Sequence, residues 1–144
     1  AEADGVYVLD TGSTDGTAER LACLGAVVVE ERVGLAFDTA RNRSLELVPE
    51  DADICVCTDL DEVFTRAAGG AGGGLDGRDH PAVYRYTWNF NQDGSEGYVF
   101  WIDNVHTRSG FEWVNPVMGA SLGGGWGMPS RICAGVQLDH HADE

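Results

Sequence analysis

The sequence predicts an α/β protein in which a parallel sheet with flanking helices is followed by a group of antiparallel, aromatic-rich strands. Residues 1–66 alternate short apolar runs with amphipathic segments, in the order strand, helix, strand, helix, strand. Such alternation implies right-handed crossovers between parallel strands. Residues 81–144 instead hold alternating aromatic segments, which are typical of antiparallel strands. The glycine-rich segment 67–80 separates these two halves of one predicted domain, residues 1–144.

The elements of the first half follow from its apolar runs and its turn residues. Three short apolar runs predict strands at residues 5–9, 26–29 and 54–57. The turn-forming residues 11–17 predict that a first helix starts near Thr14 or Asp15, and Gly25 predicts its end. A second helix is predicted from about Ala36 to Val48 by apolar residues at helical spacing, namely Phe37, Ala40, Leu45 and Val48.

The second half contains four segments that predict strands, at residues 82–91, 98–106, 111–114 and 132–138. Seven aromatic side chains in the first three segments are predicted to lie mostly in the core: Trp88, Phe90, Tyr98, Phe100, Trp101, Phe111 and Trp113. A few of them are candidates to stack on a sugar ring or a base instead. Residues 67–77 have no Lys, Ser or Thr after their glycines, so we interpret them as a flexible connector and not as a P-loop.

The composition excludes several classes of protein. The chain has 144 residues, a formal net charge of −15 and nine basic residues, all of them Arg. This acidity argues against a broad nucleic-acid-binding surface, although Arg together with a metal ion can hold a nucleoside diphosphate. No apolar run approaches the roughly 20 residues of a membrane span, and no basic and apolar leader opens the chain. The four Cys match no zinc or C-x-x-C pattern, which favours a reducing compartment. We therefore expect a cytoplasmic protein, either free or at the inner face of the membrane.

Acidic residues follow two of the three predicted strands of the first half. Asp10 ends the first strand, and Asp59 follows the third, with Asp61 and Glu62 after it. The carboxyl ends of parallel strands share one edge of the sheet, where α/β proteins bind ligands, so Asp10 and Asp59 are expected to line a common crevice. The Asp-x-Asp spacing lets two carboxylates converge on a hard divalent cation. A solvated acidic loop is the alternative interpretation of these residues.

Arg41 is the second candidate for a functional role. It lies between Phe37 and Leu45 at steps of four residues, so it is expected on the apolar side of its helix. A charge in such a place is costly unless it has a partner. Two partners remain open, since Arg41 either forms a salt bridge with an acid at the sheet edge or clamps a phosphate or base of a ligand.

Three segments in this order resemble GT-A glycosyltransferases of the family 2 type. They are the strand and turn Val8–Thr17, the segment Phe37–Asn42 with its Ala-Arg-Asn sequence, and the Asp-x-Asp motif in Thr58–Glu62. The segment His106–Trp113 and the terminal His140-His141 are similar to acceptor-side segments of bacterial members. The resemblance implies a Rossmann-like sheet in the nucleotide-sugar-binding half. It also implies metal-dependent, inverting transfer of a sugar from a nucleotide-sugar, expected to be UDP-linked, to a glycan, lipid or protein acceptor.

The resemblance also implies roles on the donor side. Asp10 would contact the base or ribose of the nucleotide-sugar, and Arg41 would lie near the base or the diphosphate. Asp59 would face the ribose or the metal ion. Asp61 would ligate Mn²⁺ or Mg²⁺ bridging the phosphates. These residues are the expected nucleotide and metal site.

Two further roles concern a histidine and a catalytic base. A His near the C-terminus often completes the metal site of such enzymes, and His140 is chosen here over His141 and His106. Inversion requires a carboxylate that takes the proton of the acceptor hydroxyl. Asp103 is ranked ahead of Glu112 for this role, because Glu112 alternates with two aromatic residues as a surface residue of a strand does.

Two departures from the family pattern keep other functions open. Members usually open with one more strand carrying an Asn-Glu pair, and a His-Glu pair often follows Pro-Val where this chain has Pro116–Gly119. A degenerate, non-catalytic GT-A-like domain that binds a sugar or a partner is therefore an alternative. A sugar-phosphate nucleotidyltransferase is disfavoured because residues 11–17 contain no basic residue. A simple cation site without a substrate does not account for Asp10 and Arg41.

Overall fold

The computed structural model describes residues 3–34, 36–65, 82–114, 121–122 and 131–140. The chain divides into two compact units, one with residues 1–51 and 112–122 and the other with residues 52–111 and 123–144. The first boundary falls before β3 (Cys55–Val56), and the single domain with halves on either side of residues 67–80 stays a prediction. In the part of the chain that is described, no helix is both long and apolar enough to cross a bilayer.

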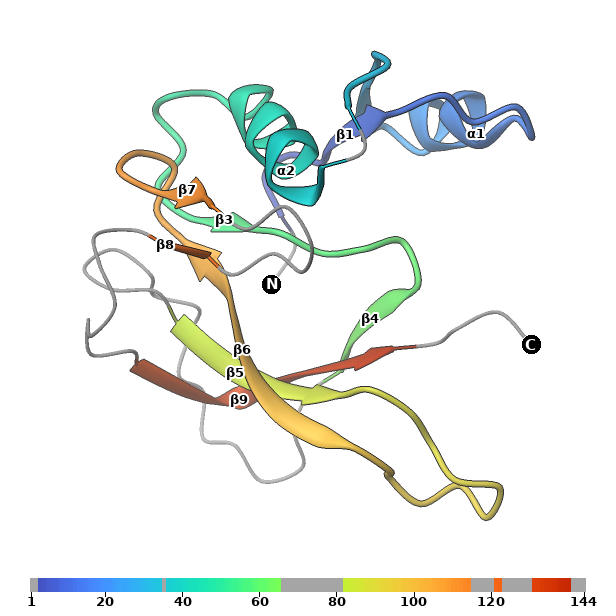
Figure 1. Ribbon diagram of the computed structural model, residues 1–144, viewed down its shortest axis with the longest axis vertical. Coiled ribbons are helices and arrows are strands. Elements are labelled where there is room, and N and C mark those ends of the chain that lie inside the picture. The colour runs from blue at the N-terminus through green and yellow to red at the C-terminus, as the bar shows by residue number, and fades with distance from the viewer. Residues whose placement is uncertain (1–2, 35, 66–81, 115–120, 123–130, 141–144) are drawn as a thin grey trace. The chain divides into compact units, whose positions relative to one another are not determined.

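The first unit contains a parallel strand pair with two helices and a short antiparallel pair. Its elements are β1 (Tyr7–Asp10), α1 (Thr17–Cys23), β2 (Val27–Glu30), α2 (Phe37–Glu46), β7 (Glu112–Trp113) and β8 (Ser121–Leu122) (Figure 1). β1 and β2 are parallel, with Asp10 opposite Glu30, and β7 is antiparallel to β8. α2 contacts both β1 and β7, so it connects the two strand pairs of this unit.

The two helices begin and end for local reasons. The carboxylate of Asp15 accepts hydrogen bonds from the N–H and the hydroxyl of Thr17, at 3.0 and 2.6 Å, and this turn places the start of α1 at Thr17. α2 ends at Glu46, shortly before Pro49, which cannot continue a helix. Of the predicted apolar face of α2, Leu45 is buried, whereas Phe37 is exposed.

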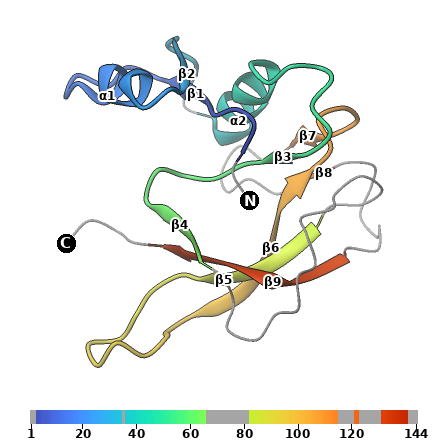
Figure 2. The same ribbon diagram turned by 180° about the vertical axis from the view of Figure 1, so that it is seen from behind.

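The second unit is built on one mixed sheet of five strands. Its strands are β3 (Cys55–Val56), β4 (Glu62–Thr65), β5 (Ala82–Thr87), β6 (Val99–His106) and β9 (Arg131–His140), in the spatial order β3-β6-β5-β9-β4. All neighbours are antiparallel except β5 and β9, which run parallel. Figure 2 shows β4, β5, β6 and β9 of this sheet from behind.

The described strand pairings give part of the predicted parallel sheet. β1 and β2 pair in parallel as expected, whereas β3 pairs with β6, with Cys55 opposite His106. Asp10 and Asp59 belong to different units, so their common crevice and the three-stranded parallel sheet stay predictions. The sequence did not predict β4, which places Glu62 opposite His140 of the last strand.

The prediction that the aromatic side chains of the second half lie mostly in the core is wrong for five of the seven. Exposed fractions lie between 39% and 77% for Trp88, Phe90, Tyr98, Phe100 and Trp101. The hairpin that joins β5 to β6 extends beyond the other strands of the sheet (Figures 1 and 2), so among the described residues no third strand flanks its outer part, residues 88–98. Trp113, by contrast, is 2% exposed.

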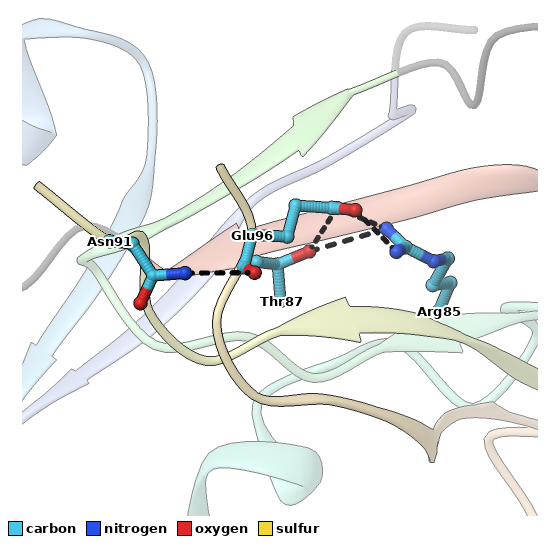
Figure 3. A network of polar contacts seen from close by, with 4 residues as sticks. All are labelled: Arg85, Thr87, Asn91 and Glu96. Carbon is cyan, nitrogen blue, oxygen red and sulfur yellow. Dashed lines mark hydrogen bonds and ion pairs between the residues drawn. The ribbon is translucent and has the colours of Figure 1, made fainter. Parts of the chain in front are cut away.

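A polar network closes the base of this hairpin. Figure 3 shows the guanidinium of Arg85 paired with the carboxylate of Glu96, which also accepts a hydrogen bond of 2.9 Å from the hydroxyl of Thr87. Asn91 donates its side-chain N–H to the carbonyl of Glu96 at 3.3 Å. Thr87 is fully buried, and its hydroxyl is thus satisfied within the network. These contacts hold the register of the hairpin although its aromatic rings are exposed.

Candidate functional site

The acidic segment after β3 forms a closed turn. The N–H of Glu62 donates to the carbonyl of Asp59 at 3.2 Å, and the N–H of Asp59 donates to Oε2 of Glu62 at 2.8 Å. Reciprocal bonds of this kind satisfy two backbone donors at once, as in a capping box. Glu62, which the sequence offers only as a third acid, therefore holds the turn that carries Asp59 and Asp61.

Tyr86 ties this turn to the sheet. Its side chain is 3% exposed, and its hydroxyl forms a hydrogen bond with the carboxylate of Glu62. Burial raises the pKa of the Tyr86 hydroxyl far above its usual range, and the hydrogen bond to Glu62 and the negative charges of Glu62, Asp59 and Asp61 add to the rise. The hydroxyl therefore stays protonated and remains a donor to Glu62 at any physiological pH.

The structure brings together two of the predicted metal ligands, Asp61 and His140. Oδ2 of Asp61 lies 2.9 Å from Nε2 of His140. The pairing of β4 with β9 produces this contact, because it sets Glu62 directly opposite His140 and so brings the preceding residue within reach. The side chain of Asp61 is 42% exposed and that of His140 is 17% exposed. A solvent-accessible carboxylate thus lies against a largely covered imidazole.

Trp88 fixes the orientation of the His140 ring. Nδ1 of His140 lies 3.1 Å from the carbonyl oxygen of Trp88, to which it donates a hydrogen bond. The imidazole also stacks on the indole of Trp88, with ring centroids 5.0 Å apart and planes inclined by 10°. A hydrogen bond from Nδ1 to a backbone carbonyl is the usual support of a metal-binding histidine, since it leaves Nε2 for the metal.

The 2.9 Å separation of Asp61 and His140 is that of a hydrogen bond or ion pair, and it is also compatible with two ligands of one divalent cation. Two neighbouring ligand atoms at about 2.1 Å from one octahedral ion are about 3 Å apart, close to the 2.9 Å between Oδ2 and Nε2. Among the residues that the structure describes, no group of three or more His, Cys, Asp or Glu side chains is arranged to hold a metal. The metal-ligand roles of Asp61, His140 and Asp59 therefore stay predictions.

Asp10 organises the turn that follows β1. It is 5% exposed, and its Oδ1 accepts hydrogen bonds from the N–H of Ser13 at 2.7 Å and of Gly12 at 2.8 Å. These bonds, that of Ser13 first, lower the pKa of the Asp10 carboxyl below its ordinary value. Gly12 has a φ of 125°, a conformation that side chains rarely adopt. The acid that ends β1 thus has a structural role, and its contact with a nucleotide stays a prediction.

Arg41 lies against an aromatic ring. Its guanidinium carbon is 4.8 Å from the ring centroid of Trp113, a cation–π arrangement. The nearby Arg43 forms ion pairs of 2.8 Å with both Glu31 and Glu46. The ring belongs to β7, more than 70 residues away in the chain. The two partners that the sequence left open for Arg41, a sheet-edge acid and a ligand, both stay predictions.

The remaining candidates are the two possible catalytic bases, Asp103 and Glu112, and the other histidines considered for the metal site. Asp103 falls within β6, and its side chain is outside the described part of the chain, as are His141 and the segment Pro116–Gly119. Glu112 is exposed in β7, opposite Leu122. His106 is buried, donates its Nδ1–H to the carbonyl of Thr107 at 2.8 Å, and stacks on Phe111. His106 therefore has a packing role.

Asn42 and Tyr86 were not singled out from the sequence, and Trp88 and Trp113 were considered there only as core or stacking rings. The alternation of the predicted strand 82–91 did contain a signal for Tyr86 and Trp88, because it places them on the same face. A comparison with models of known protein families found no match, and a comparison with curated proteins found none either.

Proposed function

We propose that this chain binds a nucleotide-sugar and carries out a metal-dependent glycosyl transfer with inversion. The observation that supports this function best is the Asp61–His140 pair, with its ligand atoms 2.9 Å apart and the imidazole held from behind by the carbonyl of Trp88. An exposed carboxylate and a fixed imidazole nitrogen are a suitable partial ligand set for Mn²⁺ or Mg²⁺. The GT-A fold remains part of this proposal.

In this function Asp61 and His140 hold the cation, and Asp59 is a further proposed ligand. When bound, the cation neutralises charge on the departing nucleoside diphosphate. A site with few protein ligands suits this role, since phosphate oxygens and water fill the remaining positions around such ions. His140 contributes by a fixed ring orientation, because Nδ1 donates to Trp88 and the ring stacks on the indole. Glu62 and Tyr86 contribute by holding the turn that carries the carboxylates.

The other proposed roles concern the nucleotide and the acceptor. Arg41 provides a fixed positive charge for the diphosphate or base. Asp10, which closes a turn with Gly12 and Ser13, contacts the base or the ribose in this proposal. Asp103 is the proposed base that takes the proton of the acceptor hydroxyl, as inversion requires. The acceptor is a glycan, lipid or protein that the chemistry of these residues does not specify.

Calorimetric titration of UDP in the presence of Mn²⁺ tests the donor site. We expect the unaltered chain to bind UDP and Asp61→Ala to lose this binding. Asp93→Ala is the matched control, because Asp93 is an exposed acid that bonds locally to Ser95 of the hairpin. Failure of the unaltered chain to bind UDP contradicts the donor site, and full binding by Asp61→Ala contradicts the metal role.

A non-catalytic sugar- or partner-binding domain is the second candidate function. The exposed aromatic rings of the β5–β6 hairpin favour it, since Trp88, Trp101 and Tyr98 offer flat apolar faces of the kind that sugars stack on. Hydrolysis of a UDP-linked sugar in the presence of Mn²⁺ separates the two functions. Turnover supports the transferase, whereas binding of the donor without any turnover favours the binding domain.

A further inference from the structure

Three aromatic rings of the β5–β6 hairpin, which belongs to the second unit, gather on one face of it. The ring centroid of Tyr86 lies 5.0 Å from that of Phe100 and 6.2 Å from that of Trp88, and the centroids of Trp88 and Phe100 are 6.4 Å apart. Tyr86 is 3% exposed, whereas Trp88 and Phe100 are 46% and 43% exposed. The two exposed rings, Trp88 and Phe100, are named here the aromatic platform. They form an apolar surface over a buried tyrosine.

The aromatic platform adjoins the proposed metal site within the same unit. His140 stacks on the indole of Trp88 with ring centroids 5.0 Å apart, and its Nε2 lies 2.9 Å from Oδ2 of Asp61. One imidazole ring therefore separates the indole from a carboxylate that is 42% exposed. In the proposed function the cation at this pair holds the diphosphate of the donor, so a ligand on the platform lies near the sugar that is transferred.

We infer that the aromatic platform binds the acceptor of the transfer and that this acceptor is a neutral saccharide. The inference rests on the proposed function and adds to it the class of the acceptor. A saccharide ring has a flat face of C–H groups, which suits an exposed indole or phenyl ring. In the transfer, an oxygen of one of its hydroxyl groups bonds to the anomeric carbon of the donor sugar as the bond from that carbon to the diphosphate breaks. The hydroxyl proton passes to the carboxylate that serves as the base.

The charge beside the platform favours a saccharide over the other classes of acceptor. An ionised carboxylate only accepts hydrogen bonds, and the hydroxyl groups at the rim of a sugar donate them. A wholly apolar ligand would remove water from Asp61 and supply no donor in return, which is costly. An anionic lipid surface is disfavoured by the net charge of −15. A neutral ligand with an apolar face and hydroxyl groups therefore fits this surface best.

The test measures saccharide binding by saturation-transfer-difference NMR, without nucleotide or metal. The probes are neutral tetrasaccharides of β-1,4-linked glucose, galactose and mannose. We expect the unaltered chain to transfer saturation to the C–H protons of at least one probe. Trp88→Leu and Phe100→Leu keep an apolar side chain but lose the flat ring, so each should weaken binding about three- to tenfold. Trp88→Tyr retains a flat ring and should keep most of the affinity.

Trp101→Leu is the matched control. Trp101 is 50% exposed and follows Phe100 directly in β6, so alternation places it on the opposite face of the strand. Its loss removes an exposed ring of the same hairpin, and we expect it to leave the affinity for the saccharide unchanged. Denaturant unfolding verifies that each variant is folded. Phe100→Leu and Trp88→Tyr give an answer even where Trp88→Leu does not fold.

Each outcome decides a different point. If the unaltered chain binds none of the three probes, the inference alone is overturned, because UDP binding with Mn²⁺ is measured separately. If Trp101→Leu weakens saccharide binding as much as Trp88→Leu, the assigned face is wrong. If a probe binds but UDP with Mn²⁺ does not, the proposed function fails and the acceptor role fails with it. Binding to phosphatidylcholine vesicles, or self-association of the chain, that is lost in Trp88→Leu would show a lipid or a second copy as the occupant and would overturn the inference.

Discussion

Two cationic or proton-carrying side chains are held in a similar way in the two units of this protein. In the first unit, Arg41 lies over the ring of Trp113, and the backbone of Trp113 is bound by the adjacent Asn42. In the second unit, His140 stacks on Trp88 and donates Nδ1 to the carbonyl of the same residue. In both places the group lies against a tryptophan ring, and the main chain of that tryptophan bonds either to the group itself, as for His140, or to its neighbour, as for Arg41.

The two places differ in the charge of the held group and in its partner. Arg41 carries a permanent charge, because a guanidinium does not lose its proton in proteins. His140 instead lies 2.9 Å from the carboxylate of Asp61, and the binding of a metal ion by this pair is part of the proposed function. In the proposed function the first unit thus supplies a positive charge, and the second supplies two ligands for a metal ion. Four comparisons test this distinction.

The largest expected effect separates the two tryptophans by stability. Trp113 is 2% exposed and Trp88 is 46% exposed. Trp113→Ala is expected to lower the free energy of unfolding by about 3–5 kcal/mol, and Trp88→Ala by only about 1 kcal/mol. Denaturant unfolding followed by circular dichroism measures both. Equal losses would contradict the assignment of Trp113 to the core and of Trp88 to the surface.

The second comparison concerns direct metal binding. Loss of a residue that merely supports a metal ligand costs about 10- to 100-fold in affinity, so loss of a ligand is expected to cost more. Asp61→Asn and His140→Gln should therefore each weaken Mn²⁺ binding at least about 100-fold, measured by the electron paramagnetic resonance of the free ion. Trp88→Ala should give the smaller loss, because it leaves both ligands in place. A Trp88→Ala loss larger than that of Asp61→Asn would reverse the proposed roles.

The third comparison uses two arginines of one helix. Arg43 forms ion pairs with Glu31 and Glu46 at the surface, so Arg43→Gln should change UDP affinity by less than about twofold, as surface pairs contribute little. Arg41→Gln should weaken UDP binding about tenfold or more, the scale of a charge-assisted hydrogen bond. Titration calorimetry at low salt measures both. Equal effects would mean that the helix contributes only its overall charge.

The smallest expected effect concerns the acid that closes the turn after β1. The folded-state pKa of Asp10 is lowered by the N–H groups of Ser13 and Gly12 below the ordinary value of 3.8. Its contribution to stability is thus fully present above pH 3.8 and is lost as the pH falls through the lower folded-state pKa. The melting temperature of Asp10→Asn should fall less between pH 5 and pH 2 than that of the unaltered chain. Parallel curves would show that the carboxylate charge does not hold the turn.

Periodicity and turn residues predicted where most helices and strands lie, because those signals are local. α2 lies within the segment of helical spacing, and β9 contains the predicted residues 132–138. The pairing of strands is not a local property. β4 was missed because Glu62–Thr65 pairs with a strand at the other end of the chain, and this pairing is what brings Asp61 to His140.

In the candidate site, too, the contacts between distant segments could not be predicted from local sequence signals. Asp61 and His140 were chosen as metal ligands from the sequence, and the structure places them 2.9 Å apart. Arg41 was expected to need a partner, but a neutral ring from β7 is not predictable from helical spacing. The exposed rings of the hairpin were misjudged because alternation predicts a strand and not which of its faces another element covers. The roles of Tyr86 and Asn42 depend on tertiary contacts alone.

The central claim is that nucleotide binding depends on a metal ion, which Asp61 and His140 of the second unit hold. The most direct measurement is the affinity of the unaltered chain for UDP, first with Mn²⁺ and then with excess chelator. We predict binding with Mn²⁺ that is lost with the chelator, and no binding by Asp61→Ala in either condition. An equal affinity for UDP with and without Mn²⁺ would contradict the account.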